Sequence, residues 1–573
     1  MSDDNANELL RRGDRRFGER QQLDSMRQEI ALNFAPHLAE WTTTLNWGAD
    51  YAAHLVDSTP LLMARDFIGL IASTLRPSGK QYFWHRTSND DINNDREVRE
   101  YLDWRSSQMM RIMTDKVTGF TRACRVADEF YALFGDAVLS VDANDLRDSL
   151  RVNSYHTKDC VWAIGNENRA DTITRRSMMP ARLVVQRFRQ ERDKVHEKVR
   201  DLCERNGDEP IEVRHEVLPA DEYDSYVRKI KPSRRGNRVD GWYSVWIDVG
   251  NRHVMRETWQ RTFKYVVPRW ITMAKMPYGI APTTTIALPD GRMIQQQALA
   301  IMEAAEKQIT PPLIATHDTI RGDIRLDGIT WVDRSYDERN GDPLRMLELG
   351  KNFQLGVASL DRTAHQLTRA FYLDVLRLPD TARTKSIPEV NFAIDEYVRS
   401  AVPLFAPIHD EYNTPLLYEI DTQIEELRGY NRPVPDRLKE NGELIFAWDN
   451  PLTDMLERQK AQKAAELAQL GQSWAGLEAA AAQSPTLQQV DTAKGFRSSA
   501  IALGVADWLL DEKEAAKRAA AGAQAQQMQQ VMSQAPNISK LIDSGVGAAQ
   551  AAQGIPNPAE PAYPVLPAPG GGP

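Results

Sequence analysis

The sequence predicts an α+β protein in which long helices lie on either side of a β-rich region. Two stretches after residue 288 carry apolar side chains at steps of three and four residues, which is typical of helices with one buried stripe. Between residues 137 and 290 the pattern becomes β-rich. The segment WYSVWIDVGNRHVMRETW alternates as a β-hairpin does, with Gly250-Asn251 in its turn.

The first part of the chain reads as helix, then helix, then strand. Residues 5–33 form a charged helix, which we interpret as a solvated amphipathic helix without chemistry. Asp57-Ser58-Thr59-Pro60 is a helix-start signature, since proline is favoured in the first turn. Pro77-Ser78-Gly79 ends that helix, and Tyr82-Phe83-Trp84 has the composition of a buried strand.

A helix pair over about 95–134 leads into the β-rich region. The second helix is expected to end at Phe134-Gly135, and a strand to begin at Ala137. LRVNSYHTKDCVWAIG and ADTITRRSMMPARLVVQRF read as paired strands that lead into a charged helix over about 185–206. The basic loop KPSRRGNRVDG could contact DNA or a partner, although most such charge runs are only solvated surface.

The two striped helices form the centre of the chain. The first opens at Pro289-Asp290-Gly291, where Asp290 can cap free N–H groups, and it stops at Pro311-Pro312. The second begins near Asn352 and would span roughly 25 residues, or about 37 Å. The apolar residues of the first stripe are Ile294, Ala298, Ile301, Ala305 and Ile309, and those of the second are Val357, Leu360, Ala364, Leu367, Phe371 and Val375. A helix with one narrow apolar stripe must pack on neighbours, within the chain or in a ring of copies.

After these helices the loop 379–388 leads to a third helix at Glu389. That helix contains Pro403, Pro407 and Pro415, each of which removes an internal hydrogen bond and bends the axis. From about 454 to 533 the sequence is helical and rich in Ala and Gln. Beyond about 545 it is rich in Pro and Gly, which predicts disorder.

Composition limits the possible functions. The chain has 573 residues, 26% of them charged, and a formal net charge of -9. This balance argues against a sequence-specific DNA-binding protein, whose affinity comes largely from neutralising phosphates. Three widely spaced cysteines predict no disulfide framework and a reducing compartment. No run of about 18 apolar residues occurs, and the polar start lacks a signal peptide, so we expect a cytosolic product that does not enter membranes.

A search for catalytic motifs finds none. Gly79-Lys80 and Gly350-Lys351 are not followed by Ser or Thr, so neither is a phosphate-binding loop of an ATPase. GxSxG, HExxH and GxGxxG do not occur, and His54, His156 and His365 lack metal-ligand spacing. Asp90-Asp91 alone does not make a two-metal nuclease. We therefore expect no catalytic residues, no metal and no cofactor.

The succession of blocks resembles a known family. YGIAPTTTIALPDGRMIQQQALAIMEAAEKQITPPLIA, then LDRTAHQLTRAFYLDVLRL, then TKSIPEVNFAIDEYVRSAVPLFAPIHDEYNTPLL are similar in order to the head-to-tail connector (portal) proteins of short-tailed, podovirus-type bacteriophages. The resemblance implies the α+β portal fold assembled as a ring. Its expected parts are an α/β wing at 1–290, stem helices at 291–310 and 352–378, a β-containing clip at 311–351, a tunnel loop at 379–388, a kinked helix and wing completion at 389–452, a helical crown at 453–535 and a disordered tail at 536–573.

The resemblance also implies a function. Such rings, usually of twelve copies, sit at one capsid vertex and let double-stranded DNA enter, stay and leave without sequence specificity. The implied partners are the large terminase, the scaffolding and major capsid proteins, the tail adaptor and the ejection proteins, in a protein made in the bacterial cytoplasm and carried in the virion. DNA contacts would come from the tunnel loop and adjacent stem, with ordinary loop exposure as the alternative for these side chains: Arg377, Arg383 and Lys385. Partner docking would use clip residues: Arg325, Asp327, Trp331 and Asp333.

Two other classes remain open from the sequence. A nucleic-acid-processing enzyme would need a cluster of carboxylates or histidines and would cleave DNA with a metal. A cytosolic helical scaffold without a channel would be a monomer or small oligomer.

Overall fold

The computed structural model describes residues 2–448 with gaps, and beyond them only Gln469, Gln472 and Ser473, which are helical. The gaps are 47, 78, 94, 145–148, 190–193, 229–240, 274–275, 310–312, 316–343, 347–352, 377–406, 442. The chain divides into two compact units, residues 1–457 and 458–573, and the helices and strands named below lie in the first. Apart from those three residues, the predicted Ala/Gln-rich helices and Pro/Gly-rich tail lie outside the described residues.

Two helices open the chain, α1 (Ser2–Glu19) and α2 (Gln21–Phe34), where the sequence predicted one. The break falls at Arg20, whose side chain is buried. Its guanidinium donates hydrogen bonds to the backbone carbonyls of Thr157 (2.7 Å) and Lys158 (2.6 Å) in the turn η2 (157–159). The prediction of a solvated helix is therefore wrong here, because this arginine finds fixed acceptors inside the protein.

A second arginine of α2 is buried in the same way. Arg27 is 1% exposed and forms an ion pair with Asp136, which is fully buried. The guanidinium also lies over the rings of Trp41 and Tyr278, 5.0 Å and 5.5 Å from their centroids. Burial raises the pKa of Asp136, while Arg27 opposes that rise.

The predicted helix start at Pro60 is confirmed. After the short turn η1 (Pro36–Leu38), helix α3 (Thr59–Leu75) begins with Pro60 in its first turn. The Asp57 carboxylate accepts a hydrogen bond of 2.7 Å from the Thr59 backbone N–H, so it satisfies one of the free donors at this end.

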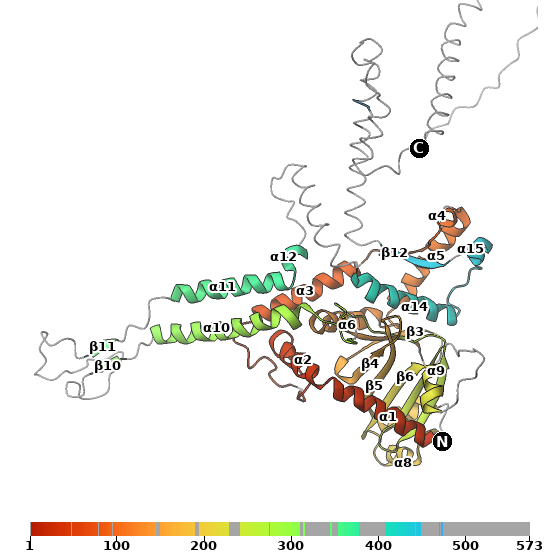
Figure 1. The fold of residues 1–573 in the computed structure, drawn as a ribbon, viewed down its shortest axis with the longest axis horizontal. Helices are drawn as coiled ribbons and strands as arrows, with labels where there is room; N and C mark the ends of the chain where they lie inside the picture. The colour runs from red at the N-terminus through yellow and green to blue at the C-terminus, as the bar shows by residue number, and fades with distance from the viewer. Residues whose placement is uncertain are drawn as a thin grey trace, which may run out of the picture. The chain divides into compact units, whose positions relative to one another are not determined.

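The β-rich region forms a five-stranded antiparallel sheet in which each strand pairs with the next one in sequence (Figure 1). Its strands are β4 (Cys160–Ile164), β5 (Ala170–Pro180), β6 (Pro210–Pro219), β7 (Trp242–Asp248) and β8 (His253–Gln260). The predicted hairpin is confirmed: β7 and β8 pair antiparallel, and Gly250-Asn251 lies between them.

Helices cover both faces of this sheet. On one face, Ala6, Leu9 and Leu10 of α1 pack with Val245 and Ile247 of β7, beside the short turns α9 (Ala220–Glu222) and η4 (Tyr223–Val227). On the other face, α7 (Ala181–Arg187) and α8 (Glu197–Arg205) pack against Val213 and Trp246. The single helix predicted over 185–206 is thus two helices, and β5 runs directly into the first.

A smaller sheet has the order β3-β2-β9 and lies in the main apolar core. Its strands are β2 (Val138–Ala143), β3 (Leu150–Tyr155) and β9 (Tyr265–Val266). The predicted helix pair is α5 (Arg96–Thr114) and α6 (Phe120–Phe134), and α6 ends at Gly135 as expected. Gly135 has φ +83, and a Cβ there would lie 2.7 Å from the Ala281 backbone nitrogen, so only glycine fits this position.

The described C-terminal segments return to the N-terminal part. Strand β12 (Leu444–Trp448) pairs antiparallel with β1 (Phe83–Thr87). The predicted aromatic strand is therefore confirmed, and the short helix α4 (Asp90–Asn93) follows it. The elements before β12 are the π-helical turn η7 (His409–Asn413), α14 (Thr414–Glu426) and α15 (Asp436–Asn441). Pro415 lies in the first turn of α14, where proline is tolerated; Pro403 lies outside the described residues.

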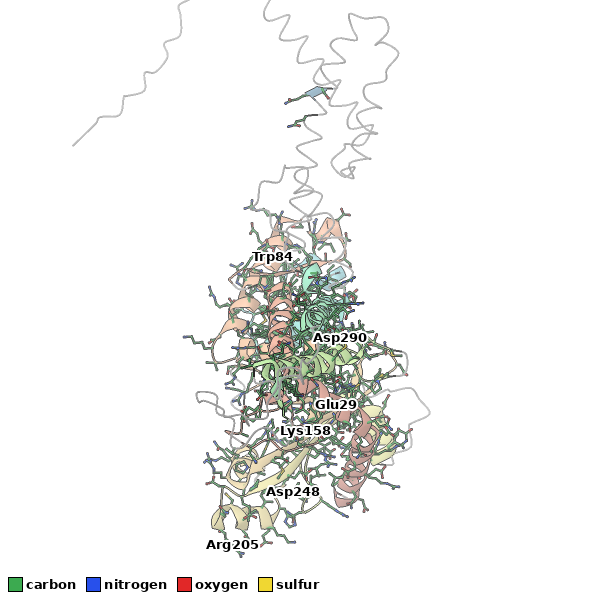
Figure 2. All side chains as sticks on the ribbon, turned by 90° about the vertical axis from the view of Figure 1, so that its left-hand side faces the viewer. Glu29, Trp84, Lys158, Arg205, Asp248 and Asp290 are labelled. Atoms are coloured by element: carbon green, nitrogen blue, oxygen red, sulfur yellow. The ribbon has the colours of Figure 1, made fainter. Side chains whose placement is uncertain are left out.

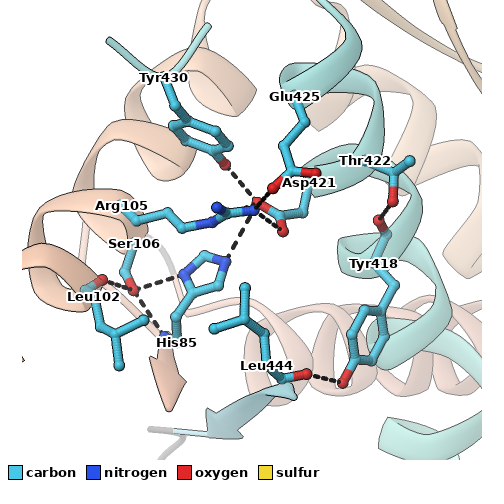
Figure 3. A network of polar contacts seen from close by, with 10 residues as sticks. All are labelled: His85, Leu102, Arg105, Ser106, Tyr418, Asp421, Thr422, Glu425, Tyr430 and Leu444. Carbon is cyan, nitrogen blue, oxygen red and sulfur yellow. Dashed lines mark hydrogen bonds and ion pairs between the residues drawn. The ribbon is translucent and has the colours of Figure 1, made fainter. Parts of the chain in front are cut away.

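A buried polar network joins these distant segments (Figure 3). Arg105 of α5 donates from Nη2 to Asp421 Oδ2 (2.6 Å) and also pairs with Glu425. The Tyr430 hydroxyl donates to Asp421 Oδ1 (2.6 Å), and His85 Nε2 lies 3.4 Å from the same oxygen. Burial by itself would raise the pKa of Asp421, but His85 and Arg105 outweigh it and lower that pKa to about 2.

The remaining elements form a hairpin. They are η5 (Thr283–Ala287), α10 (Leu288–Ile309), β10 (Leu313–Ala315), β11 (Leu344–Met346), α11 (Phe353–Ala370) and α12 (Leu373–Leu376).

The three thiols are free: Cys124 and Cys160 are buried and Cys203 is partly exposed. None of the helices in the described residues is both long enough and apolar enough to cross a bilayer.

Candidate interaction surface on the helical hairpin

Helices α10 and α11 lie side by side, and β10 and β11 pair antiparallel between them in sequence (Figure 1). With 22 and 18 residues, the helices are about 33 Å and 27 Å long. Ile294 and Ala298 are buried between α10 and its neighbours, as the first stripe predicts. Farther along, a Cβ on Gly356 would lie 3.2 Å from Ile301 Cγ1, so the two helices are in close contact there.

The far ends of the predicted stripes are not buried. Ile309 is 81% exposed and Val357 is 39% exposed, so at these ends the stripes are not covered within the chain, and packing in a ring of copies stays a prediction. By contrast, Leu367 and Phe371 at the near end are fully buried. Among the described residues, the near end packs on α2 and α3, whereas at the far end α10 and α11 pack on each other.

A polar contact fixes how the two helices are aligned. Gln297 of α10 donates to the Ser359 hydroxyl (3.0 Å) and accepts from the Thr363 hydroxyl (3.0 Å), both on α11. Thr363 is 2% exposed and its hydroxyl also lies 3.0 Å from the Ser359 carbonyl within α11, so a shift of one helix along the other would break the bonds to Gln297 only.

Aromatic rings anchor the root of the hairpin. Phe371, at the end of α11, packs edge-on against Phe34 of α2 and at a tilt against Phe67 of α3, with 5.4 Å between centroids in each case. Gly291 of α10 lies over the Phe34 ring, where a Cβ would come within 2.8 Å of Cζ. The first turn of α10 can therefore approach α2 only because this residue has no side chain.

Polar bonds hold the same root. The Gln295 side-chain oxygen accepts from the backbone N–H groups of Val56 (2.8 Å) and Asp57 (2.9 Å), and its nitrogen donates to the Asp57 carbonyl (2.8 Å). Arg292 forms an ion pair with Glu29 of α2 (Figure 2 labels Glu29). One glutamine thus joins α10 to the segment that caps α3.

The expected cap at Asp290 is wrong. Helix α10 begins at Leu288 and continues directly from the π-helical turn η5, so Asp290 (labelled in Figure 2) lies inside the first turn. Partial burial raises the pKa of its carboxyl group.

The outer half of the hairpin exposes large apolar side chains. Leu299 is 47% exposed, Met302 59% and Leu355 65%, in addition to Ile309 at the end of α10. A helix pair with a fixed root and apolar groups facing solvent is the arrangement expected of a surface that binds another protein surface. Leu299 and Met302 were not predicted because they lie outside the main stripe, although their spacing of three residues is visible in the sequence.

The sequence-predicted site residues cannot be placed. The DNA-contact candidates Arg377, Arg383 and Lys385 lie outside the described residues. The docking candidates do too: Arg325, Asp327, Trp331 and Asp333. Strands β10 and β11 flank the undescribed part of the predicted clip on either side. Within the part of the chain that the structure describes, no three His, Cys, Asp or Glu side chains are grouped so as to hold a metal ion.

Comparisons with known proteins place these features in context. A family model described as "Bacteriophage head to tail connecting protein" matches residues 6–510. Among curated proteins nothing matches. Two similar solved structures are the neck of an empty gene transfer agent (GTA) particle, computed with C6 symmetry, and the virion of the native GTA particle. Each has a TM-score of 0.30 and 10% identity, and the match covers 74% of this chain and 90% of the other.

Proposed function

The chain belongs to the bacteriophage head-to-tail connecting proteins, a structural and non-enzymatic family, and we propose that it forms the ring-shaped portal of a short-tailed phage. In this proposal about twelve copies stand at one capsid vertex and surround a channel for double-stranded DNA. A connecting protein of this kind is a component of the virion.

The observation that carries the ring proposal is the apolar outer half of the hairpin. Leu299, Met302 and Leu355 face solvent in the single chain, while Gln295 and Phe371 fix the hairpin root. Identical hairpins placed side by side around an axis would bury these groups against each other. Such head-to-tail contacts close into a ring when the rotation between copies allows it.

The stem and tunnel loop would face the DNA. Duplex DNA carries one charge per ~1.7 Å of its axis, so a strongly basic wall would hold it and slow its movement. A chain of net charge -9 with a few cations at the loop would make weak, exchangeable contacts. We assign those contacts to Arg377, Arg383 and Lys385 in and next to the loop 379–388.

The tip of the hairpin would be the docking surface. The clip, residues 311–351, would bind the large terminase during packaging and a tail adaptor afterwards, through residues that include Arg325, Asp327, Trp331 and Asp333. The terminase would supply the ATPase, and the other partners would be scaffolding, major capsid and ejection proteins. The wing, the kinked helix at 389–452 and the crown at 453–535 would complete the subunit.

The test is the assembly state of the purified chain. We expect negative-stain images to show perforated rings, and light scattering to give the mass of about twelve copies. The variant Leu299→Glu/Met302→Glu should shift the chain to monomers while circular dichroism stays unchanged, because both side chains are already exposed. The matched control, Gln296→Glu/Gln308→Glu, adds the same charge at exposed polar positions of α10 and should still form rings. A wild-type chain that stays monomeric at high concentration would refute the proposal.

A further inference from the structure

The connection between α5 and α6 is rich in positive charge. Residues 111–125 contain four cations and one carboxylate, in a chain whose net charge is -9. All four cationic side chains are exposed. We call this surface the basic turn, and it consists of Arg111, Lys116, Arg122 and Arg125.

These four cations are not neutralised. Within the described residues, none of them makes a hydrogen bond or ion pair from its side chain, and the nearby Asp115 carboxylate accepts from the Val117 backbone N–H (3.3 Å). Four other exposed arginines of the described chain are paired: Arg15 with Glu19, Arg96 with Glu100, Arg182 with Asp208 and Arg437 with Asp95. The basic turn is therefore a free positive surface and not part of an ion-pair network.

The backbone that presents these charges is fixed. The Thr118 hydroxyl donates to the Ile112 carbonyl (2.9 Å), and the Thr118 carbonyl accepts from the Val152 N–H of β3 (2.9 Å). Gly119 has φ +70 and begins α6 without a side-chain cap. The backbone between α5 and α6 is therefore held by contacts to α5 and β3.

The placement of Arg122 disfavours an explanation from the stability of α6. Helix α6 has no acidic residue in its first turn, and Arg122 lies there instead. A cation near a helix N-terminus opposes the helix dipole and costs a little stability. Arg111 lies in the last turn of α5, where a cation is favourable, so the cost to the fold falls on Arg122.

The chemistry of the partner follows from what the basic turn contains and lacks. A protein interface usually has an apolar centre. Among residues 111–125 the strongly exposed large apolar side chain is Val117 (69% exposed), and a single valine does not form such a centre. Phe120 is 5% exposed, so residues 111–125 offer no aromatic ring on which an unpaired base could stack. Arginine and lysine without base-reading groups suit the phosphates of a duplex.

We propose that the basic turn binds the phosphate backbone of double-stranded DNA, at a second DNA-contacting surface separate from the loop 379–388. This proposal does not depend on that loop, because the basic turn lies on described helices of the wing region. The contact is independent of sequence and weakens as salt is added.

The test measures the salt dependence of DNA binding by the purified full chain. A fluorescently labelled 30-base-pair duplex is titrated by anisotropy between 50 and 200 mM NaCl. The variant Arg111→Glu/Lys116→Glu/Arg122→Glu/Arg125→Glu should lower the slope of log K against log salt by about 3 to 4, since each lost phosphate contact removes about 0.9. Its affinity at 100 mM NaCl should fall at least about tenfold.

The matched control reverses four paired cations instead, as Arg15→Glu/Arg96→Glu/Arg182→Glu/Arg437→Glu. This control makes the same change in net charge. It should reduce the DNA affinity, and the slope of log K against log salt, much less than the basic-turn variant does. A third variant, Arg377→Ala/Arg383→Ala/Lys385→Ala, should keep the part of the slope that depends on the basic turn. Ring formation is imaged separately for every variant, so a failure of the portal proposal is distinguished from a failure of this one.

Four outcomes would overturn the inference. The first is that the wild-type chain does not bind DNA, and the second is that the basic-turn variant and its control lose the same DNA affinity. The third is that a poly-glutamate peptide binds through the same four residues as tightly as DNA does. The fourth is that the basic-turn variant no longer forms rings but binds DNA as the wild type does. The third would assign the surface to an acidic polypeptide, and the fourth would assign it to a neighbouring copy of the chain.

Discussion

The guanidinium of Arg105 on α5 binds both carboxylate oxygens of Asp421 on α14, at 3.2 Å and 2.6 Å, across 316 residues of sequence. This pair is buried together with the hydroxyl of Tyr430, and it joins the first and last described thirds of the compact unit. The pair is therefore a direct probe of whether the two segments are docked.

Arg105→Met should destabilise the chain strongly. The variant leaves the buried Asp421 carboxylate without its main cation, and breaking a buried pair costs about 3–5 kcal/mol. Urea unfolding followed by circular dichroism measures this cost. Arg96→Met is the control, because Arg96 is exposed on the same helix and pairs only with exposed Glu100, so it should leave the midpoint unchanged. Equal midpoints for the two variants would contradict the assigned role.

Glu216 should make the chain less stable as pH rises. This residue of β6 is buried beneath α1, where a Cβ on Gly13 would lie 2.8 Å from its Oε1. Burial raises the pKa of Glu216 from 4.5 to about 7, although Thr174, Arg16 and Arg214 oppose the rise. Since the folded state holds this proton more tightly, its stabilising effect is complete below about pH 4.5 and is lost as pH rises through 7.

Glu216→Gln should accordingly gain stability relative to the wild type between pH 5 and pH 8. The expected gain in the free energy of unfolding is about 2–3 kcal/mol, from a pKa difference of this size. Urea titrations at the two pH values measure it. Glu19→Gln, at an exposed position of α1, should show no such difference, and a parallel pH response of Glu216→Gln and the wild type would disprove the assignment.

Replacing glycine by alanine should change the stability of the chain in opposite directions at Gly135 and at Gly18. Gly135 has φ +83 and backbone atoms within 3 Å of any Cβ, so Gly135→Ala should cost several kcal/mol, of the order of strained backbone plus displaced neighbours. Gly18 lies within α1 with nothing within 4 Å, so Gly18→Ala should stabilise by roughly 0.5–1 kcal/mol. Thermal unfolding of both variants tests the pair, and a stable Gly135→Ala chain would show that the close approach to Ala281 is not required.

Gln295→Ala should loosen the root of the hairpin. The change removes the acceptor of two backbone N–H groups, at exposed Val56 and half-buried Asp57, at a cost of about 0.5–1.5 kcal/mol. Hydrogen exchange should then speed up in α10 and at residues 56–59. Gln296→Ala, its exposed neighbour, should exchange like the wild type; faster exchange in both would mean that the effect is a general one of helix α10.

Much of the secondary structure follows from the sequence because its signals are local. Pro60, Gly135 and Gly250-Asn251 each mark a boundary through backbone preference, and each boundary is confirmed. What local patterns could not predict is which charges are buried. Arg20, Arg27 and Arg105 look like surface arginines in sequence, yet each is enclosed because its acceptors come from segments far along the chain.

The candidate interaction surface was only partly predictable for a related reason. The stripes identified the side of each helix that meets its partner, as Ile294 and Leu367 show. The stripe pattern does not tell how far cover within the chain extends, so it could not predict that Ile309 and Val357 are exposed in the single chain. The root contacts of Gln295 depend on a loop more than two hundred residues away, for which the helix pattern carries no signal.

The pairing of β1 with β12 also has a consequence for synthesis. Residues that complete the fold around Arg105 leave the ribosome only after another 316 residues have been added, which takes about 15 to 60 s at ordinary translation rates. During that interval β1 has an unpaired edge and the nascent protein presents an unfinished core. A cell that makes this protein in quantity would have to keep such half-made chains apart, and fragments that stop before β12 should accumulate in the insoluble fraction.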